Sequence, residues 1–354
     1  MQLRSIGELR LLEEIRRRFN THARKGDSGI IVGIGDDAAA FAPLPGKMLV
    51  TTDLMHEGVD FDLTYTAPFH IGFKLVSVNV SDIMAMGGAP GYLLLAMSMK
   101  GDADETFFRE FCDGVEDALQ LYGMALIGGD LSSARHDMVF SATVIGSGGK
   151  LITRGGATAG DRIYVTSVTG DAACGLELLK RLAPESREAV KLWKNYAGPL
   201  PDLMLTNGTG FVKLDGGKIT PLLARHLMPA AREVRELLPH ITSMIDISDG
   251  LFIDLSRICD ESGAGARIYL EKIPISDSMR FAADLMGLSP AELAASGGED
   301  YELLFTIPAQ AAETLGCIQA FCIGEITEKE RVTIDCTGRE AVLKTEGYQH
   351  FGTA

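Results

Sequence analysis

The stretch Val78-Asn79-Val80-Ser81-Asp82-Ile83-Met84-Ala85-Met86-Gly87-Gly88-Ala89-Pro90 sets an amide, a hydroxyl and a carboxylate inside an otherwise apolar segment. Pro68 suits the first turn of a helix that we expect over residues 68–86, and the Gly-Gly pair ends that helix. Asn79 and Asp82 are three residues apart and therefore share a face of the helix. An unpaired buried carboxylate is strongly unfavourable, so Asp82 predicts a cation, a metal or hydrogen-bond donors beside it.

Working outward from this helix, carboxylates recur where short apolar segments end. Strands are predicted at residues 30–34, 48–52, 124–127 and 243–247, each running into a turn with an acidic residue. The candidate metal ligands, with Asp82, are Asp37, Asp53, Asp130, Asp246 and Asp249. Asp37, Asp130 and Asp249 each have another interpretation when taken alone, because Asp is a common turn former and a common helix N-cap. Taken together the candidate ligands favour a divalent-metal and phosphate site, since Mg²⁺ prefers oxygen ligands and shares them with substrate phosphates.

The chain length predicts two domains, because 354 residues exceed the size at which one core keeps growing. Predicted strands alternate with long helices in both halves, which indicates an α/β or α+β protein. We place the boundary at the Gly-Gly pair Gly148-Gly149, giving domains at residues 1–148 and 149–354. Residues from about 184 to 220 are rich in Pro and Gly, and we expect an irregular excursion there.

The net charge of −15 argues against sequence-independent binding to nucleic acid or to an anionic membrane, because both need basic surfaces. The six cysteines form no CxxC pair and no zinc-ligand spacing, which favours free thiols in a reducing cytoplasm. The sequence shows neither a secretory signal pattern nor an apolar run of about 20 residues. We therefore expect a cytoplasmic protein that binds neither nucleic acid nor membrane.

Familiar nucleotide motifs are missing from the sequence. It has no GxxxxGK[ST] loop, no HRD or DFG set, and no GxGxxG followed by an acidic residue in a βαβ frame. Arg154, beside Gly155-Gly156, is the best-placed cation for gripping a phosphate, although an exposed, solvated Arg is equally compatible with that loop. None of the seven histidines sits in a recognisable triad, so acyl transfer has no support.

Nine short stretches follow one another in a fixed order over nearly the whole chain. They are Gly33-Ile34-Gly35-Asp36-Asp37-Ala38-Ala39, Thr51-Thr52-Asp53, Val78-Asn79-Val80-Ser81-Asp82-Ile83, Leu126-Ile127-Gly128-Gly129-Asp130, Arg154-Gly155-Gly156-Ala157, Arg225-His226-Leu227, Ile245-Asp246-Ile247-Ser248-Asp249-Gly250-Leu251, Ser296-Gly297-Gly298-Glu299-Asp300-Tyr301-Glu302-Leu303 and Gly347-Tyr348-Gln349-His350-Phe351. With these stretches the chain resembles the thiamine-monophosphate kinases, a family of the aminoimidazole-ribonucleotide-synthetase-like superfamily.

The resemblance implies roles for individual residues. Metal ligands would be Asp37, Thr52, Asp53, Asp82, Asp130, Asp246 and Asp249. ATP contacts would be Thr51, Thr52, Gly129, Arg154 and Ser248, and the thiamine moiety would meet Asp60, Glu299 and Tyr348. Among these, Asp130, Asp249 and Arg154 would act in catalysis. Asp60 stands where many members of the family carry His, and Tyr348 is equally compatible with packing of the C-terminal tail.

The same resemblance implies a two-domain fold of the aminoimidazole-ribonucleotide-synthetase type. Residues 1–148 would bind ATP and several Mg²⁺ ions and pair their sheet across a homodimer, and the α/β domain 149–354 would close over the active site. The implied reaction is transfer of the γ-phosphate of ATP to thiamine monophosphate. Two alternatives stay open: another ATP-dependent enzyme of the superfamily, acting in purine or selenophosphate synthesis, and a nucleotide-binding maturation or scaffold protein.

Overall fold

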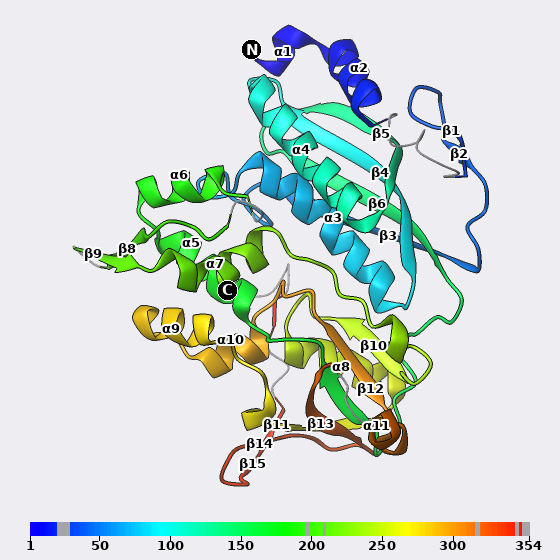
Figure 1. Cartoon of the computed structure of the whole chain (residues 1–354), viewed down its shortest axis with the longest axis vertical. Coiled ribbons are helices and arrows are strands. Elements are labelled where there is room, and N and C mark those ends of the chain that lie inside the picture. Colours follow the sequence, from blue (N-terminus) through cyan, green and yellow to red (C-terminus); the bar gives the residue numbers. More distant parts are fainter. Residues whose placement is uncertain (20–28, 195–197, 208–209, 316–318, 344–346, 349–354) are drawn as a thin grey trace. The chain divides into compact units, whose positions relative to one another are not determined.

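The computed structural model describes residues 1–19, 29–194, 198–207, 210–315, 319–343 and 347–348. Residues 349–351 of the C-terminal motif lie outside the described residues. The chain divides into two compact units (Figure 1). Unit 1 comprises Met1–Met84 and Gly88–Gly149, and unit 2 comprises Ala85–Gly87 and Lys150–Ala354. Within the described residues, no helix is both long and apolar enough to cross a membrane.

Unit 1 is built on a four-stranded sheet in the order β3-β6-β4-β5. Its strands are β3 Lys47–His56, β4 Ala89–Lys100, β5 Ala125–Ala134 and β6 Val139–Gly148. β4 and β5 are parallel, whereas β6 lies between β3 and β4 and is antiparallel to both. The other elements of this unit are α1 Leu3–Ile6, α2 Glu8–Phe19, the pair β1 Ile30–Val32 and β2 Ala40–Phe41, α3 Pro68–Ala85 and α4 Glu105–Tyr122.

Helices α3 and α4 lie side by side in unit 1 (Figure 1). Their backbones approach so closely that a Cβ on Gly114 would lie 1.9 Å from the Phe69 carbonyl oxygen, and one on Gly72 would lie 2.2 Å from that of Phe111. Phe111 also stacks on Phe140 of β6, with ring centroids 4.4 Å apart. The helix pair therefore rests on the face of the sheet to which Phe140 belongs.

The structure confirms the helix expected over residues 68–86, which is α3. The prediction that Asp53 and Asp130 lie in turns at strand ends is wrong, because both lie inside strands. The ladder between β4 and β5 continues through Gly129, which faces the Leu95 carbonyl oxygen at a distance that only glycine tolerates, since an added Cβ would lie 1.9 Å from it. The Gly-Gly pair thus serves close strand packing, and the strand does not end there.

Unit 2 is built on a seven-stranded sheet in the order β10-β12-β7-β13-β11-β14-β15. Its strands are β7 Arg162–Val165, β10 Ser243–Asp246, β11 Gly265–Tyr269, β12 Leu303–Ile307, β13 Phe321–Thr327, β14 Arg331–Ile334 and β15 Glu340–Val342. All pairs are antiparallel except β11 with β14. Every residue of β10 and β12 is buried, so these two strands have protein on both faces.

Unit 2 also contains helices between its strands. They are α5 Asp171–Arg181, α6 Pro184–Leu192, α7 Gly216–Leu227, α8 Leu251–Ser262, α9 Asp277–Met286, α10 Pro290–Ser296 and α11 Ala309–Leu315, with 3-10 turns η3 Arg235–Leu237 and η4 Leu270–Lys272. Residue contacts join α5 with α7 and α9, and α8 with α10. The loop before α8 and the loop before β12 carry the acidic motifs of this half.

The prediction of an irregular excursion over residues 184–220 is wrong. The segment contains α6, the hairpin of β8 Leu203–Asn207 with β9 Gly210–Leu214, and the start of α7. Pro184 occupies the first position of α6, where its missing N–H has no partner to lose. Asp215 caps α7 by accepting the Lys218 N–H. The Pro and Gly residues mark the ends of these elements.

Candidate functional site

Strand β3 provides hydrogen-bond partners for Asn79 and Asp82 of α3. Asn79 is fully buried, and its Oδ1 accepts the Asp53 N–H at 3.0 Å while its Nδ2 donates to the Leu75 carbonyl at 2.9 Å. Asp82 accepts the Thr51 hydroxyl at 2.5 Å. The sequence predicted that Asp82 needs a partner, and Thr51 is one. These contacts bring Thr51, Asp53 and Asp82 together on the helix-covered face of the sheet.

Negative charge accumulates around Asp53. Burial raises the pKa of the Asp53 carboxyl to about 6, with further contributions from Asp82 and then Asp60. Asp60 is held in place by the His56 N–H, which donates to its Oδ2 at 2.8 Å. Oxygen donors with excess negative charge suit a hard divalent cation such as Mg²⁺.

These carboxylates do not form a finished metal cage. Within the described residues, no group of three or more His, Cys, Asp or Glu side chains is close enough to hold a metal ion. Mg²⁺ commonly binds through one or two carboxylates and takes its other ligands from water and substrate phosphates. The residues around Asp53 therefore fit Mg²⁺ that arrives with a phosphate ligand.

Thr52 and Asp130 are not gathered with Asp53 through their side chains. Thr52 follows Thr51 in the strand, so it points to the opposite face, where its hydroxyl donates to the Ala142 carbonyl at 3.0 Å. Asp130 is exposed on β5, in register with the exposed Ala96 of β4. Because β6 and β4 separate β3 from β5, three strand spacings of ~4.8 Å put Asp130 about 14 Å from Asp53 along the sheet.

Among the described contacts, none joins Asp37 to Asp53, Asp82 or Asp130. Asp37 is exposed in the connection between β1 and β2, and its N–H donates to Asp36 Oδ1 at 2.9 Å. The Gly-Asp-Asp segment thus has the local side-chain-to-backbone bond expected of a turn.

In unit 2, the turn from β10 into α8 carries the second set of acidic residues. Asp246 ends β10 and is buried, whereas Ser248 and Asp249 are half-buried. Gly250 has φ of 138°, and a Cβ there would lie 2.8 Å from the Ser296 carbonyl oxygen. The glycine of this motif is therefore required both by its backbone conformation and by its neighbour.

Two residues that sequence reasoning missed organise this turn. Asp254, in the first turn of α8 and fully buried, accepts the N–H groups of Ser248, Asp249 and Gly250 on one oxygen. Arg257 binds the other oxygen of Asp254 and also Oδ2 of Asp249. Burial raises the pKa of Asp254 to about 6, and Arg257 opposes that rise. An acidic residue in the first turn after Ser-Asp-Gly was the available signal.

The segments around Glu299 and Tyr348 adjoin the same turn. The Glu299 N–H donates to the Ser248 carbonyl at 2.8 Å, and the Tyr348 N–H donates to the Asp249 carbonyl at 3.1 Å. Oε2 of Glu299 lies 3.1 Å from Nδ1 of the buried His226, and the Tyr348 side chain is 49% exposed. The structure thus brings Ser248, Asp249, Glu299 and Tyr348 into one neighbourhood.

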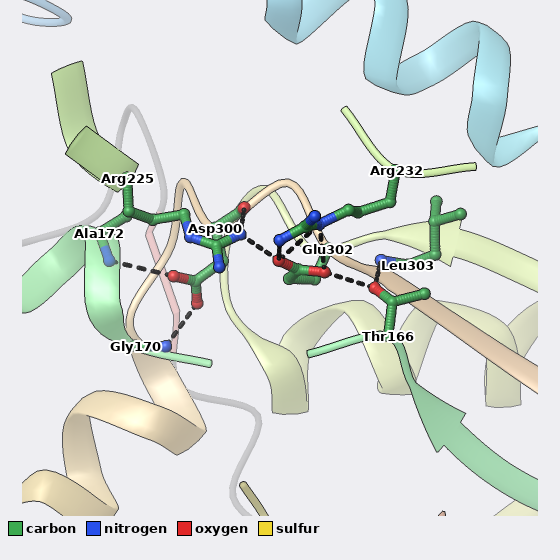
Figure 2. Close-up of polar contacts among 8 residues, drawn as sticks. All are labelled: Thr166, Gly170, Ala172, Arg225, Arg232, Asp300, Glu302 and Leu303. Atoms are coloured by element: carbon green, nitrogen blue, oxygen red, sulfur yellow. Dashed lines mark hydrogen bonds and ion pairs between the residues drawn. The ribbon is translucent and has the colours of Figure 1, made fainter. Parts of the chain in front are cut away.

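Glu299 has a backbone conformation that is unfavourable for a residue other than glycine. Its φ is 68° and that of Tyr301 is 51°, both in the left-handed region that non-glycine residues rarely adopt. Asp300, between them, is fully buried and accepts the Gly170 and Ala172 N–H groups at 2.5 and 3.0 Å (Figure 2). Burial raises the pKa of Asp300 to about 7. Asp300 therefore anchors this loop to the start of α5.

Glu302 anchors the other end of the loop. Figure 2 shows its carboxylate between Arg225 and Arg232, with Thr166 donating to it at 2.5 Å. The Thr166 hydroxyl in turn accepts the Leu303 N–H at 2.9 Å. The acidic residues of the Gly-Gly-Glu-Asp-Tyr-Glu motif therefore divide: Asp300 and Glu302 hold the loop, and Glu299 is the partly exposed one.

Arg154 lies at the opposite end of α8 from Asp249. Its carbonyl accepts the hydroxyl of Ser262, the last residue of α8, and that hydroxyl also accepts the Gly156 N–H. Twelve helical residues span about 18 Å, which is longer than an Arg side chain. Within unit 2, Arg154 is exposed and is not gathered with Asp246 and Asp249.

Comparisons with known proteins define the class. The family description "AIR synthase related protein, N-terminal domain" matches residues 35–147, and "AIR synthase related protein, C-terminal domain" matches residues 212–337. The first range lies in unit 1 except for residues 85–87, and the second lies in unit 2. Fold and motifs therefore define an AIR synthase related protein of two α/β units, as the sequence predicted.

More specific relatives cover nearly the whole chain. The thiamine-monophosphate kinase of Aquifex aeolicus (strain VF5) is 31% identical over 353 residues, which is 99% of this chain and 100% of the relative. The structure of the thiamine-monophosphate kinase from Stenotrophomonas maltophilia K279a matches with a TM-score of 0.72 at 30% identity, over 92% of this chain and 96% of that chain. AaThiL complexed with AMPPCP and TMP matches with a TM-score of 0.71 at 29% identity, over 99% of each chain. The chain belongs to the thiamine-monophosphate kinase family.

Proposed function

We propose that this protein transfers the γ-phosphate of ATP to thiamine monophosphate, giving thiamine diphosphate and ADP. The observation that carries the proposal is the likeness over 99% of the chain to a thiamine-monophosphate kinase. The full-length structural likeness to AaThiL complexed with AMPPCP and TMP supports it, because AMPPCP is an ATP analogue.

The proposed reaction requires little proton transfer by side chains of the protein. A phosphate monoester has a second pKa near ~6, so the acceptor is already an ionised nucleophile at neutral pH. The obstacle is repulsion between two polyanions, and catalysis consists of positioning them and neutralising their charge. The oxygen-rich residues on β3, α3 and the β10–α8 turn suit this task better than proton transfer.

The proposal includes several Mg²⁺ ions, which when bound would neutralise phosphate charge. The proposed ligands are Asp37, Thr52, Asp53, Asp82, Asp130, Asp246 and Asp249. The raised pKa of Asp53 supports this assignment, because clustered carboxylates gain most from a cation. The separation of about 14 Å between Asp53 and Asp130 favours more than one ion, since two Asp side chains on one ion span less than that.

The nucleotide and the thiamine moiety would meet different residues. For ATP we propose Thr51, Thr52, Gly129, Arg154 and Ser248, and for the thiamine moiety Asp60, Glu299 and Tyr348. In this scheme Asp130, Asp249 and Arg154 take part in phosphate transfer. The shared neighbourhood of Ser248, Asp249, Glu299 and Tyr348 supports a place where nucleotide and acceptor meet.

We further propose a homodimer that pairs the sheet of the domain at residues 1–148, with the domain at 149–354 closing over bound substrates. The sheet face opposite α3 and α4 carries exposed apolar side chains on β3: Met48, Val50 and Leu54, which are 44%, 67% and 57% exposed. Exposed apolar rows of this kind favour a protein partner. Val50→Lys should give a monomer by light scattering, whereas Leu192→Lys, at an exposed position of α6, should not.

The direct test is incubation with ATP, Mg²⁺ and thiamine monophosphate, followed by chromatography for thiamine diphosphate. ATP hydrolysis without that product would contradict the proposed reaction. Asp130→Asn should fold normally and lose most turnover, while Asp137→Asn, at an exposed position between β5 and β6, should keep it. Near-normal turnover by Asp130→Asn would contradict the metal assignment.

A further inference from the structure

The start of α8 has the geometry of an anion site. The backbone N–H groups of Ser248, Asp249 and Gly250 are consecutive and converge on a single point, at 3.1, 3.1 and 3.2 Å from one oxygen. Consecutive amides at the start of a helix commonly bind phosphate, because they point at the ligand and the helix dipole favours negative charge. Here the oxygen at that point is Oδ2 of Asp254, a residue of the helix itself.

The other carboxylate oxygen of Asp254 links the turn to the side chain of Arg257. Arg257 binds Oδ1 of Asp254 and, with its second nitrogen, Oδ2 of Asp249. The carbonyls of the turn are also occupied, since the Ser248 carbonyl accepts the Glu299 N–H and the Asp249 carbonyl accepts the Tyr348 N–H. The backbone N–H groups of the turn and the carbonyls of Ser248 and Asp249 are therefore hydrogen-bonded within the chain. The side chains of Ser248 and Asp249 remain partly exposed.

The charge balance follows from the same contacts. The single guanidinium of Arg257 pairs with both Asp249 and the fully buried Asp254, so one positive charge faces two carboxylates. The turn therefore keeps an excess of negative charge. Without Asp254, the positive end of α8 and Arg257 would stand beside Asp249 and disfavour a cation.

We propose that Asp254 is a positioning residue. Its carboxylate occupies the anion site at the start of α8, so that the turn between β10 and α8 binds a cation in preference to an anion. The inference rests on the proposed function in one respect, which is that Ser248 and Asp249 bind Mg²⁺-nucleotide. Asp254 touches neither metal nor nucleotide in this scheme. It fixes the backbone through three N–H groups and the Asp249 side chain through Arg257.

The test is calorimetric binding of AMPPCP across a series of MgCl₂ concentrations, comparing the wild type with Asp254→Asn. This variant keeps the shape of the side chain and removes its charge. The Mg²⁺ concentration at half-maximal binding should rise about 10- to 100-fold, the usual cost of losing a residue that orients metal ligands. In EDTA, without Mg²⁺, the affinity for AMPPCP should instead increase by at least about threefold, because one negative charge has gone.

Asp260→Asn is the matched control, since Asp260 lies on the same helix, is exposed and pairs with Arg331. It should leave both measurements unchanged. The proposal is overturned if Asp254→Asn keeps the wild-type Mg²⁺ dependence, if Asp260→Asn shifts equally, or if the Mg²⁺ requirement rises with no gain in Mg²⁺-free affinity. The last result would mean that Asp254 only stabilises the fold.

A measurement on the wild type covers the case in which Asp254→Asn does not fold. Hydrogen exchange at the amides of residues 248–250 should be slow in the ligand-free protein, because Asp254 already accepts their hydrogens. Inorganic phosphate should not slow it further. Fast exchange, or protection gained on adding phosphate, would show an open anion site and overturn the proposal.

These experiments fail separately from the proposed function. They use AMPPCP without thiamine monophosphate, so they need no turnover. If the wild type makes no thiamine diphosphate but Asp254→Asn shifts as expected, the reaction is wrong and the role of Asp254 stands. If the wild type makes the product and Asp254→Asn does not shift, the reaction stands and the role of Asp254 is wrong.

Discussion

The substitution Glu302→Gln keeps the size and shape of the side chain and removes its charge. We expect it to destabilise unit 2 strongly. Glu302 is fully buried and faces two guanidinium groups, those of Arg225 and Arg232, and the Thr166 hydroxyl. The Arg225 side chain is only 13% exposed, whereas that of Arg232 is 40% exposed. Neutralising Glu302 thus removes the carboxylate that pairs directly with the largely desolvated guanidinium of Arg225.

The size of the effect follows from that burial. Removing one partner of a buried ion pair typically costs about 3–5 kcal/mol, because the remaining charge has lost its water without compensation. Arg232 can turn to solvent and adds little. Glu302 also holds the end of a loop with two left-handed residues, Glu299 and Tyr301, so we expect the upper part of that range.

The chain contains one tryptophan, which makes the assay specific to unit 2. Trp193 is buried in that unit, and its Nε1 donates to the Gly198 carbonyl at 2.8 Å. In urea, with m-values of about 1–3 kcal/mol per molar, the fluorescence midpoint of Glu302→Gln should fall by more than about 1 M.

Glu325→Gln is the control for this prediction. Glu325 also pairs with two arginines of the same sheet, Arg162 and Arg267, but its side chain is 23% exposed. A partly solvated pair contributes about 1 kcal/mol or less. If the two variants unfold at the same urea concentration, burial does not govern the contribution of Glu302 to the stability of unit 2.

Three further predictions address unit 1 and the substrate. Gly114→Ala should destabilise unit 1 by several kcal/mol, because the new Cβ would lie 1.9 Å from the Phe69 carbonyl oxygen; circular dichroism melting checks this, and an unchanged melting temperature would contradict the close helix crossing. Since the pKa of Asp53 is raised to about 6 and Mg²⁺ competes with its proton, Mg²⁺ affinity measured by calorimetry should rise between pH 5 and 7 and then level off; an Mg²⁺ affinity independent of pH would count against Asp53 as a ligand. Tyr348→Ala should raise the KM for thiamine monophosphate more than that for ATP, because an aromatic face near the thiazolium charge offers ~0.5–2 kcal/mol; equal effects on both would favour a packing role.

The sequence predicted the features that depend on residues close together in the chain. The helix over residues 68–86 followed from a proline, an apolar run and a Gly-Gly stop, and the structure has it at Pro68–Ala85. The family was also recognisable, because its motifs are short runs whose order survives at about 30% identity. The excursion over residues 184–220 was missed, since Pro and Gly at element boundaries look the same in sequence as Pro and Gly in an irregular loop.

By itself the sequence determined which family this chain belongs to, that it folds as two α/β units, and which acidic residues are candidates for its chemistry. Only the tertiary structure decided how each of them is used. Asp82 meets Thr51 from a strand 31 residues away, and Asp300 caps a helix 130 residues before it. Whether a carboxylate binds its own backbone, holds another loop or faces solvent depends on partners that are distant in the chain. Motif spacing contains no information about those partners, because only folding brings them together.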